Sequence, residues 1–240
     1  MVRPASGRRR WRALRVAGWA LTLAVTAVLA LQLWYFARVL WWSRFDPGPT
    51  SFMRQELARL RQTDPDRQLR HDWVPYARIS VHLKRAVIAA EDARFSGHDG
   101  VDWDAIERAY EHNLRRGRAV RGGSTITMQL ARNLFLSGER SYLRKGQEVV
   151  ISYMIETAMT KRRILELYLN VAEWGVGVFG AEAGARHHYG VSAAQLASWQ
   201  AARMAAMLPR PRYYDVNRGS AALERRAAIV GRRMGSVDPP

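Results

Sequence analysis

The strongest pattern along the chain is an uninterrupted apolar run over residues 16–37, VAGWALTLAVTAVLALQLWYFA, which contains no charged side chain. A helix of this length, rising about 1.5 Å per residue, would span roughly 33 Å and cross the hydrocarbon core of a bilayer. A cleaved signal peptide would have a shorter run ending in a small-x-small site, and a buried core helix is rarely this long without a charge. We therefore predict a single transmembrane signal-anchor helix.

The remaining pattern is mainly helical, because apolar residues recur every three or four positions and alternating strand patterns are nearly absent. Capping residues mark several starts, including Ser80, Asp102, Ser141 and a Ser192–Gln195 capping box. The predicted helices cover 80–91, 102–110, 124–135, 141–159, 161–171 and 192–209, with a short surface helix within 51–72.

Breaker residues and changes in polarity predict the domain organisation. Asp46-Pro47-Gly48-Pro49 is a natural linker after the apolar run. The expected organisation is a basic tail over 1–15, the membrane helix over 16–37, a linker over 38–64, one all-α domain over 65–215 and a polar C-terminal tail over 216–240.

Charge changes this picture. The 240 residues carry 38 Lys and Arg against 21 Asp and Glu, a net charge of +17, and no cysteine. The absence of cysteine excludes disulfides, thiolate metal sites and cysteine nucleophiles. Such a basic chain could bind nucleic acid or an anionic membrane. However, six arginines and no acid lie in the first 15 residues. This asymmetry predicts a cytoplasmic N-terminus and an extracytoplasmic domain, which argues against nucleic acid as a partner.

The segment EDARFSGHDGVD, from Glu91 to Asp102, follows an apolar helix and contains four acids and one histidine. A carboxylate at the end of such a helix is a candidate for partial burial and a raised pKa, as a general acid or base requires. An acidic surface loop or a metal loop is the alternative, although the glycines lack the spacing of an EF-hand.

The segment GGSTITMQLARN, from Gly122 to Asn133, resembles an anion-binding helix start, because two glycines precede Ser124 and two threonines. No lysine follows the second glycine, so it is not a nucleotide P-loop. An ordinary capped helix is the alternative. Residues 112–138 contain no acid but five arginines, a stretch that could neutralise a pyrophosphate or contact anionic lipid.

Three later segments have plainer interpretations from spacing alone. RKGQE places Lys145 three residues before Glu148, which favours an exposed ion pair on a helix. KRRILELYLN, over 161–170, is typical of a packing helix. The small residues of 175–190 would permit close helix contacts, and His187 and His188, being adjacent, are expected to point to different helix faces and to be poor joint metal ligands.

Taken in order, these segments resemble the peptidoglycan glycosyltransferase family, which also forms the N-terminal module of bifunctional penicillin-binding proteins. The similarity runs from about Trp73 to Tyr214, and five motifs carry it: Glu91–Asp102, Gly122–Asn133, Arg144–Glu148, Lys161–Asn170 and Gly177–Arg186. The chain resembles the monofunctional, membrane-anchored kind of member. The resemblance implies an all-α, lysozyme-like domain with a small membrane-facing jaw lobe. No Ser-x-x-Lys motif occurs, so the resemblance implies no transpeptidase activity.

The resemblance also implies a reaction. The substrate would be lipid II, the product a linear glycan strand made with inversion, and the leaving group undecaprenyl pyrophosphate. Glu91 matches the catalytic base of the family. Glu148 matches its second catalytic glutamate, whose role would be to assist the reaction or to hold a metal ion. The implied roles of the other residues are pyrophosphate binding by Arg132, Arg140 and Lys145, donor orientation by Ser124, Gln129 and Asn133, and support of the loop by Asp92 and His98.

Two positions depart from the family pattern. Met128 stands where many members have a first glutamine, which removes a donor contact, and Arg132 stands where lysine is common. The resemblance requires no cofactor, because cationic side chains can neutralise the pyrophosphate. A divalent ion such as Mg²⁺ or Mn²⁺ could assist them.

The expected location is the bacterial inner membrane, with the N-terminus in the cytoplasm and the catalytic domain in the periplasm. The expected partners are lipid II, the nascent strand, membrane lipids and other proteins of cell-wall synthesis or division. A lytic hydrolase of similar fold and a non-enzymatic division scaffold are the alternatives. The hydrolase is disfavoured by the arginine-rich stretch, and the scaffold would not depend on Glu91.

Overall fold

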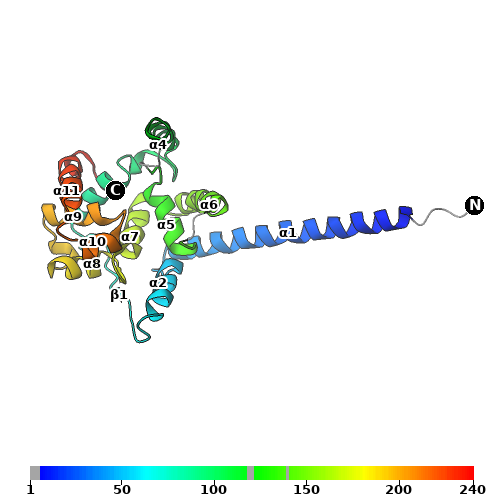
Figure 1. Cartoon of the computed structure of the whole chain (residues 1–240), viewed down its shortest axis with the longest axis horizontal. Coiled ribbons are helices and arrows are strands. Elements are labelled where there is room, and N and C mark those ends of the chain that lie inside the picture. The colour runs from blue at the N-terminus through cyan, green and yellow to red at the C-terminus, as the bar shows by residue number, and fades with distance from the viewer. Residues whose placement is uncertain (1–5, 118–121, 139–140) are drawn as a thin grey trace, which may run out of the picture.

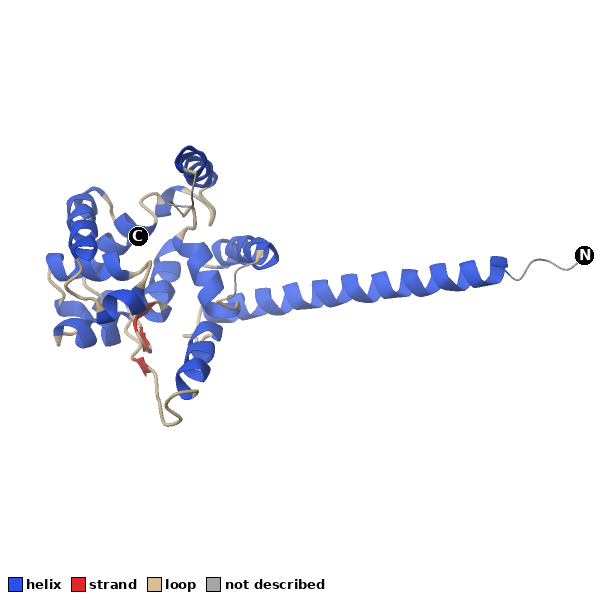
Figure 2. Ribbon diagram, in the orientation of Figure 1, coloured by secondary structure: helices blue, strands red, loops and turns tan. Residues whose placement is uncertain are grey.

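The computed structural model describes residues 6–117, 122–138 and 141–240, and this part of the chain is mainly helical, as the spacing predicts. A long first helix extends from a body formed by the other elements (Figures 1 and 2). The helices are α1 (Ser6–Trp42), α2 (Ser51–Arg61), α3 (Val81–Glu91), α4 (Trp103–Arg116), α5 (Ile126–Phe135), α6 (Tyr142–Ala158), α7 (Lys161–Val171), α8 (Ala181–Tyr189), α9 (Ser198–Met207), α10 (Pro211–Val216) and α11 (Ala221–Arg233). The strands are β1 (Arg70–His71), β2 (Glu173–Gly175) and β3 (Val178–Phe179).

Helix α1 contains the whole predicted membrane span and continues beyond both of its ends. The part from Trp11 to Trp42 contains an 18-residue window with a mean hydropathy of 1.9 and is long and apolar enough to cross a membrane. Every side chain from Trp11 to Leu31 is exposed. An apolar helix surface with no protein against it is the surface that lipid would cover.

Local capping signals place most of the helices. Ser80 Oγ accepts a hydrogen bond from the backbone N–H of His82 at the start of α3, and Asp102 Oδ1 accepts one from Ala105 at the start of α4. Ser141 Oγ does the same for α6, accepting from the N–H of Arg144. The predicted bounds of α7, 161–171, are those observed. These side chains satisfy N–H groups that the first helical turn leaves unpaired.

The segment between the anchor and the domain is more ordered than the expected linker. The first five residues of 38–64 continue α1, and α2 begins after Thr50, which caps it. Met53 and Leu60, seven residues apart on α2, are buried, and α2 packs against α5. The apolar spacing of a short helix therefore joins α2 to the body.

The C-terminal segment also differs from expectation. The helix predicted over 192–209 is divided into a 3-10 turn, Ala193–Gln195, with the expected capping box, and α9. Within the expected polar tail, residues 221–233 form α11, whose Leu223 and Val230 are buried against the body. Helix α11 packs against α9 and α3. Two apolar positions seven residues apart in an arginine-rich segment are enough to seat this helix.

A small three-stranded sheet packs against α8 and α10. Strand β3 lies between β1, to which it is parallel, and β2, to which it is antiparallel. Glycines permit the close packing that follows: a Cβ on Gly184 of α8 would lie 2.8 Å from Cγ of Trp174. The small residues of 175–190 therefore do allow close contact, and Trp174 is fully buried beneath them.

Candidate active site

Glu91 is the last residue of α3, a helix whose preceding residues from Ala86 to Ala89 are buried in the body. This position takes the carboxylate to the edge of the apolar interior, as the sequence predicts. Burial raises the pKa of Glu91 above its ordinary value. A hydrogen bond from Gln129 and the charges of Arg226 and Arg132 oppose that shift without cancelling it.

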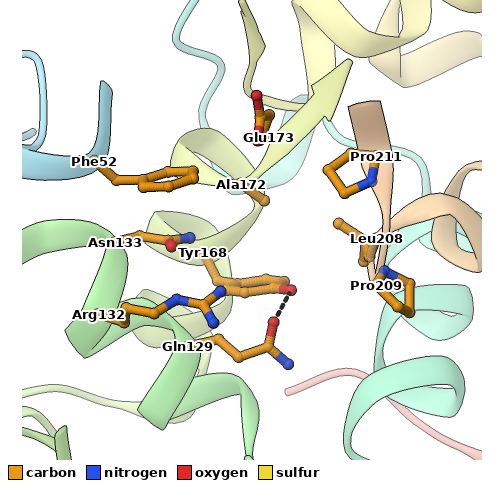
Figure 3. Close-up of a pocket in the computed structure, with 10 residues that line it drawn as sticks. All are labelled: Phe52, Gln129, Arg132, Asn133, Tyr168, Ala172, Glu173, Leu208, Pro209 and Pro211. Carbon is orange, nitrogen blue, oxygen red and sulfur yellow. Dashed lines mark hydrogen bonds between the residues drawn. The ribbon is translucent and has the colours of Figure 1, made fainter. Parts of the chain in front are cut away.

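Gln129 on α5 connects Glu91 to the interior. Its Nε2 donates a hydrogen bond of 2.7 Å to Oε2 of Glu91, while its Oε1 accepts one of 3.0 Å from the hydroxyl of Tyr168. Figure 3 shows the bond to Tyr168, with both side chains at the edge of the same pocket. Tyr168 is fully buried on α7, and its phenol pKa is raised well above the ordinary value, chiefly by burial. The phenol therefore stays a neutral donor that fixes the orientation of the Gln129 amide.

Asp92 and His98 hold the loop after Glu91 in place. Nε2 of His98 lies 2.9 and 3.0 Å from the two carboxylate oxygens of Asp92. The same carboxylate accepts a hydrogen bond of 3.0 Å from the backbone N–H of Ile126, the first residue of α5. Asp92 thus joins the loop after α3 to the start of α5, which supports the predicted role in shaping this loop.

The glycine turn before α5 brings that helix close to α4. A Cβ on Gly123 would lie 2.8 Å from the backbone Cα of Ile106, so glycine alone fits there without a shift. Thr125 caps α5, accepting from Met128 N–H, and the helix begins at Ile126, two residues later than predicted. Ser124, just before the cap, faces a cationic side chain of α6.

That side chain is Lys145. Its Nζ donates a hydrogen bond of 2.8 Å to Oγ of Ser124 and one of 2.7 Å to Oε2 of Glu148. Arg144 also forms an ion pair with Glu148. The Glu148 side chain is only 4% exposed and that of Lys145 is 41% exposed, so the pair is partly buried rather than exposed as spacing favours. Arg140, the third predicted pyrophosphate residue, lies outside the described residues.

Glu148 and Asp92 do not present free carboxylate oxygens to a divalent ion. Both oxygens of Glu148 are bonded, one to Arg144 and one to Lys145. Both oxygens of Asp92 are bonded to His98. These two carboxylates therefore do not fit Mg²⁺ or Mn²⁺, which require carboxylate oxygens free to ligate.

Three adjoining pockets surround these residues. A cleft of about 360 Å³ lies between α3, α5 and α11. Beside it, a pocket of about 180 Å³ also includes Glu91 in its lining, with Asp102, Arg108 and the glycine turn. The third, about 130 Å³, is drawn in Figure 3 between α2, α5 and α10. The 360 Å³ cleft is lined by Ala90, Glu91, Gly122, Ser124, Gln129, Arg132, Leu208, Pro209 and Arg226.

Asn133 and Arg132 face the third pocket together with Gln129 (Figure 3). Asn133 is buried, and its Oδ1 has no hydrogen-bond partner among the described residues. A buried carbonyl oxygen without a donor is uncommon in proteins and suits a ligand N–H or O–H. Met128, in contrast, is buried in the interior and lines none of these three pockets.

Several residues of the cleft were not predicted. Arg226 comes from α11, within the segment expected to be a tail. Tyr168, which lines the third pocket, comes from the helix interpreted as packing. Phe52 and Glu173 line the third pocket. Burial raises the pKa of Glu173 to about 7, although Arg212 donates hydrogen bonds of 2.9 and 3.1 Å to its carboxylate.

His187 and His188 form a separate cluster. Their ring centroids lie 4.8 Å apart, and one ligand atom from each, with one from Asp215, lie within 4.8 Å of one another. The expectation that the rings diverge is therefore wrong. Arg70 and Arg218 lie 3.1 and 3.0 Å from the ring nitrogens of His187. Two guanidinium groups at these nitrogens disfavour a metal cation beside His187.

The chain is similar to known proteins over nearly its whole length. Residues 55–235 match the Transglycosylase family. The chain is 61% identical over 222 residues to the biosynthetic peptidoglycan transglycosylase of Herminiimonas arsenicoxydans, covering 92% of this chain and 96% of that protein. It is 59% identical over 248 residues to the protein of that name from Bordetella pertussis, covering both chains completely. The corresponding protein of Thiobacillus denitrificans is 58% identical over 233 residues, which is 97% of this chain and 99% of that one.

Proposed function

Because the chain belongs to the transglycosylase family and is a peptidoglycan glycosyltransferase, we propose that it polymerises lipid II into linear glycan strands. Lipid II is a disaccharide-pentapeptide carried on undecaprenyl pyrophosphate. The growing strand acts as the donor and a new lipid II molecule as the acceptor. These substrates are those that the family resemblance implies. The position of Glu91 in the structure supports it as the base of the reaction.

The observation that carries the proposal is that Glu91 lines two pockets at once. Arg132 and Arg226 line one pocket, and Arg108 lines the other. Glycosyl transfer between two large lipid-linked substrates needs one base with a binding site on each side. A hydrolase of glycan strands also binds sugars on both sides of the scissile bond, but it needs no cations for a pyrophosphate leaving group, whereas Arg132 and Arg226 line the cleft beside Glu91.

In the proposed reaction Glu91 removes the proton from the acceptor 4-hydroxyl. The freed oxygen forms a bond to the anomeric carbon of the donor, on the face opposite the leaving group. The bond from that carbon to the pyrophosphate oxygen breaks, undecaprenyl pyrophosphate leaves, and the configuration inverts. A base whose pKa is raised towards the working pH suits this proton transfer. Burial supplies the required direction of shift for Glu91.

Cations in the cleft and beside it would offset charge on the departing pyrophosphate. Arg132 offers a planar fork for two phosphate oxygens, and Lys145 a point charge beside Ser124. Glu148, bonded to Lys145 and Arg144, would keep Lys145 in position rather than act as a second base. Gln129 and Asn133 would orient the donor sugars. Arg140 would also bind the pyrophosphate, as the family resemblance implies.

The N-terminal helix fits a single-pass protein of the inner membrane. We propose that the arginine-rich N-terminus lies in the cytoplasm and the catalytic domain in the periplasm, in agreement with the positive-inside rule. A reporter fused to the C-terminus tests this, since periplasmic alkaline phosphatase activity is expected and cytoplasmic fluorescence alone would contradict it. The absence of a Ser-x-x-Lys motif supports a lack of transpeptidase activity.

Incubation of the purified full-length protein with labelled lipid II tests the function. Wild type should form polymeric glycan, and Glu91→Gln should lose at least about a hundredfold in rate, the usual contribution of a general base. Glu107→Gln makes the same chemical change on the exposed surface of α4 and should retain the wild-type rate. A wild type that forms no polymer, or that shortens preformed strands instead, would contradict the proposed polymerase.

A further inference from the structure

The last turns of the membrane helix are not free of the catalytic domain. From Trp11 to Leu31 every side chain of α1 is exposed, but beyond that one face becomes covered. The covered residues recur at three- and four-residue intervals, which is the spacing of one helical face. They are Gln32, Tyr35, Phe36, Val39 and Trp42.

Aromatic and ionic contacts seat this face on the body. The ring centroid of Phe135, the last residue of α5, lies 5.1 Å from that of Tyr35 and 5.0 Å from that of Trp42. Arg163 on α7 donates hydrogen bonds of 3.1 and 3.0 Å to the carbonyl oxygen of Trp42 and one of 2.8 Å to that of Phe45. These carbonyls have no partner within the helix, so a guanidinium caps the end of α1.

One contact lies farther into the span. Gln32 and Gln147 of α6 form a reciprocal pair, in which Nε2 of each donates 2.9 Å to Oε1 of the other. Gln32 lies inside the 16–37 run. An amide without a partner in a lipid environment is unfavourable, so the pair favours a single rotation and height of α1 against α6.

Gln147 occupies a sensitive place on α6, between Lys145 and Glu148. One side of the helix is held by the bond of Lys145 to Ser124, and the side that Gln147 presents is held by α1. Of the first-turn side chains, Tyr142 is 98% and Leu143 89% exposed, so Arg144, paired with Glu148, and Lys145 make the contacts of this turn. Gly146 weakens this part of the helix further.

We propose that α1 is a positioning element of the active site as well as an anchor. Through the Gln32–Gln147 pair it holds the start of α6, and with it Lys145, at the height and rotation that the lipid-linked pyrophosphate requires. Gln32 and Gln147 are positioning residues that act through Lys145. The inference rests on the proposed function of Lys145 in binding that pyrophosphate.

Steady-state kinetics of the full-length protein in lipid nanodiscs test the proposal. Gln32→Leu and Gln147→Leu should each raise KM for lipid II by about three- to thirtyfold, the range for interhelical hydrogen bonds in membranes, with kcat unchanged. Leu33→Ala, an exposed neighbour on the lipid side of α1, is the matched control and should leave both constants unchanged. An unchanged KM in both glutamine variants would overturn the proposal.

Hydrogen exchange supplies a measurement that does not depend on activity. In Gln32→Leu the amides of residues 142–150 should exchange faster, while those of α7 should not. Because the chain has no cysteine, Gln32→Cys combined with Gln147→Cys can be joined by a short bis-maleimide, and this link should restore the wild-type KM. Unchanged exchange in α6 would overturn the positioning role, even if the wild type failed to polymerise lipid II and the proposed function fell.

Discussion

Gln129 holds Glu91 by a hydrogen bond of 2.7 Å from its Nε2 to Oε2 of the carboxylate. The donor end of this amide is fixed because its other end accepts from the buried hydroxyl of Tyr168. Glu91 therefore combines two opposing influences. Burial raises its pKa, and the amide stabilises its ionised form and lowers the pKa in part.

Removal of that amide should move the pH profile in a definite direction. In Gln129→Ala the pKa of Glu91 should rise, so the acidic limb of kcat/KM should shift to higher pH, with about tenfold lower activity on that limb. Tyr168→Phe keeps the bond to Glu91 but loosens the amide and should produce a smaller shift in the same direction. An acidic limb in Gln129→Ala identical to that of wild type would show that this hydrogen bond does not lower the pKa of Glu91.

Arg132 should matter by the shape of its side chain as well as by its charge. Arg132→Ala should raise KM for lipid II by about ten- to a hundredfold, since hydrogen bonds to charged groups are among the stronger ones. Arg132→Lys restores the charge without the planar fork and should recover part of that loss. Steady-state kinetics of the three proteins distinguish these cases. Equal KM values for wild type and Arg132→Ala would remove Arg132 from the pyrophosphate site.

The sequence predicted those elements whose signals are local. Ser80, Asp102 and Ser141 cap the helices they were expected to start, because a cap depends only on the next few N–H groups. The all-α class and the long apolar helix follow in the same way from spacing and length. Glu91 could be selected because it ends an apolar helix.

The parts that sequence missed depend on distant neighbours. Arg226 lines the cleft only because α11 packs on α9 and α3, and its own segment was expected to be a polar tail. Tyr168 lies on an apolar stripe, so its hydroxyl bond to Gln129 cannot be read from spacing. His187 and His188 were expected to diverge, but Asp215, 27 residues beyond, lies against both. In each case the determining partner is remote in sequence.

The glycine turn before α5 offers a test of stability with its own control. In Gly123→Ala the new Cβ would lie 2.8 Å from the Cα of Ile106, which is backbone and cannot move aside easily. The variant should be destabilised by about 1–3 kcal/mol, as for other overpacked sites. Gly122→Ala meets nothing within 4 Å and should leave the stability near that of wild type. Thermal unfolding of both variants makes the comparison, and equal midpoints would contradict the close approach of α4 to this turn.

Glu173 should make the stability of the fold depend on pH. Burial, opposed by the hydrogen bonds from Arg212, raises the pKa of this carboxyl from 4.5 to about 7. The folded state therefore binds a proton more tightly than the unfolded state, and the resulting stabilisation is complete below about pH 4.5 and lost as the pH rises to about 7. The glutamine of Glu173→Gln does not titrate in this range. The unfolding midpoint of this variant should therefore fall less than that of wild type between these pH values. Glu107→Gln, on the exposed surface of α4, serves as the control and should follow the wild-type curve. Parallel curves for wild type and Glu173→Gln would mean that Arg212 keeps this carboxylate ionised throughout the range.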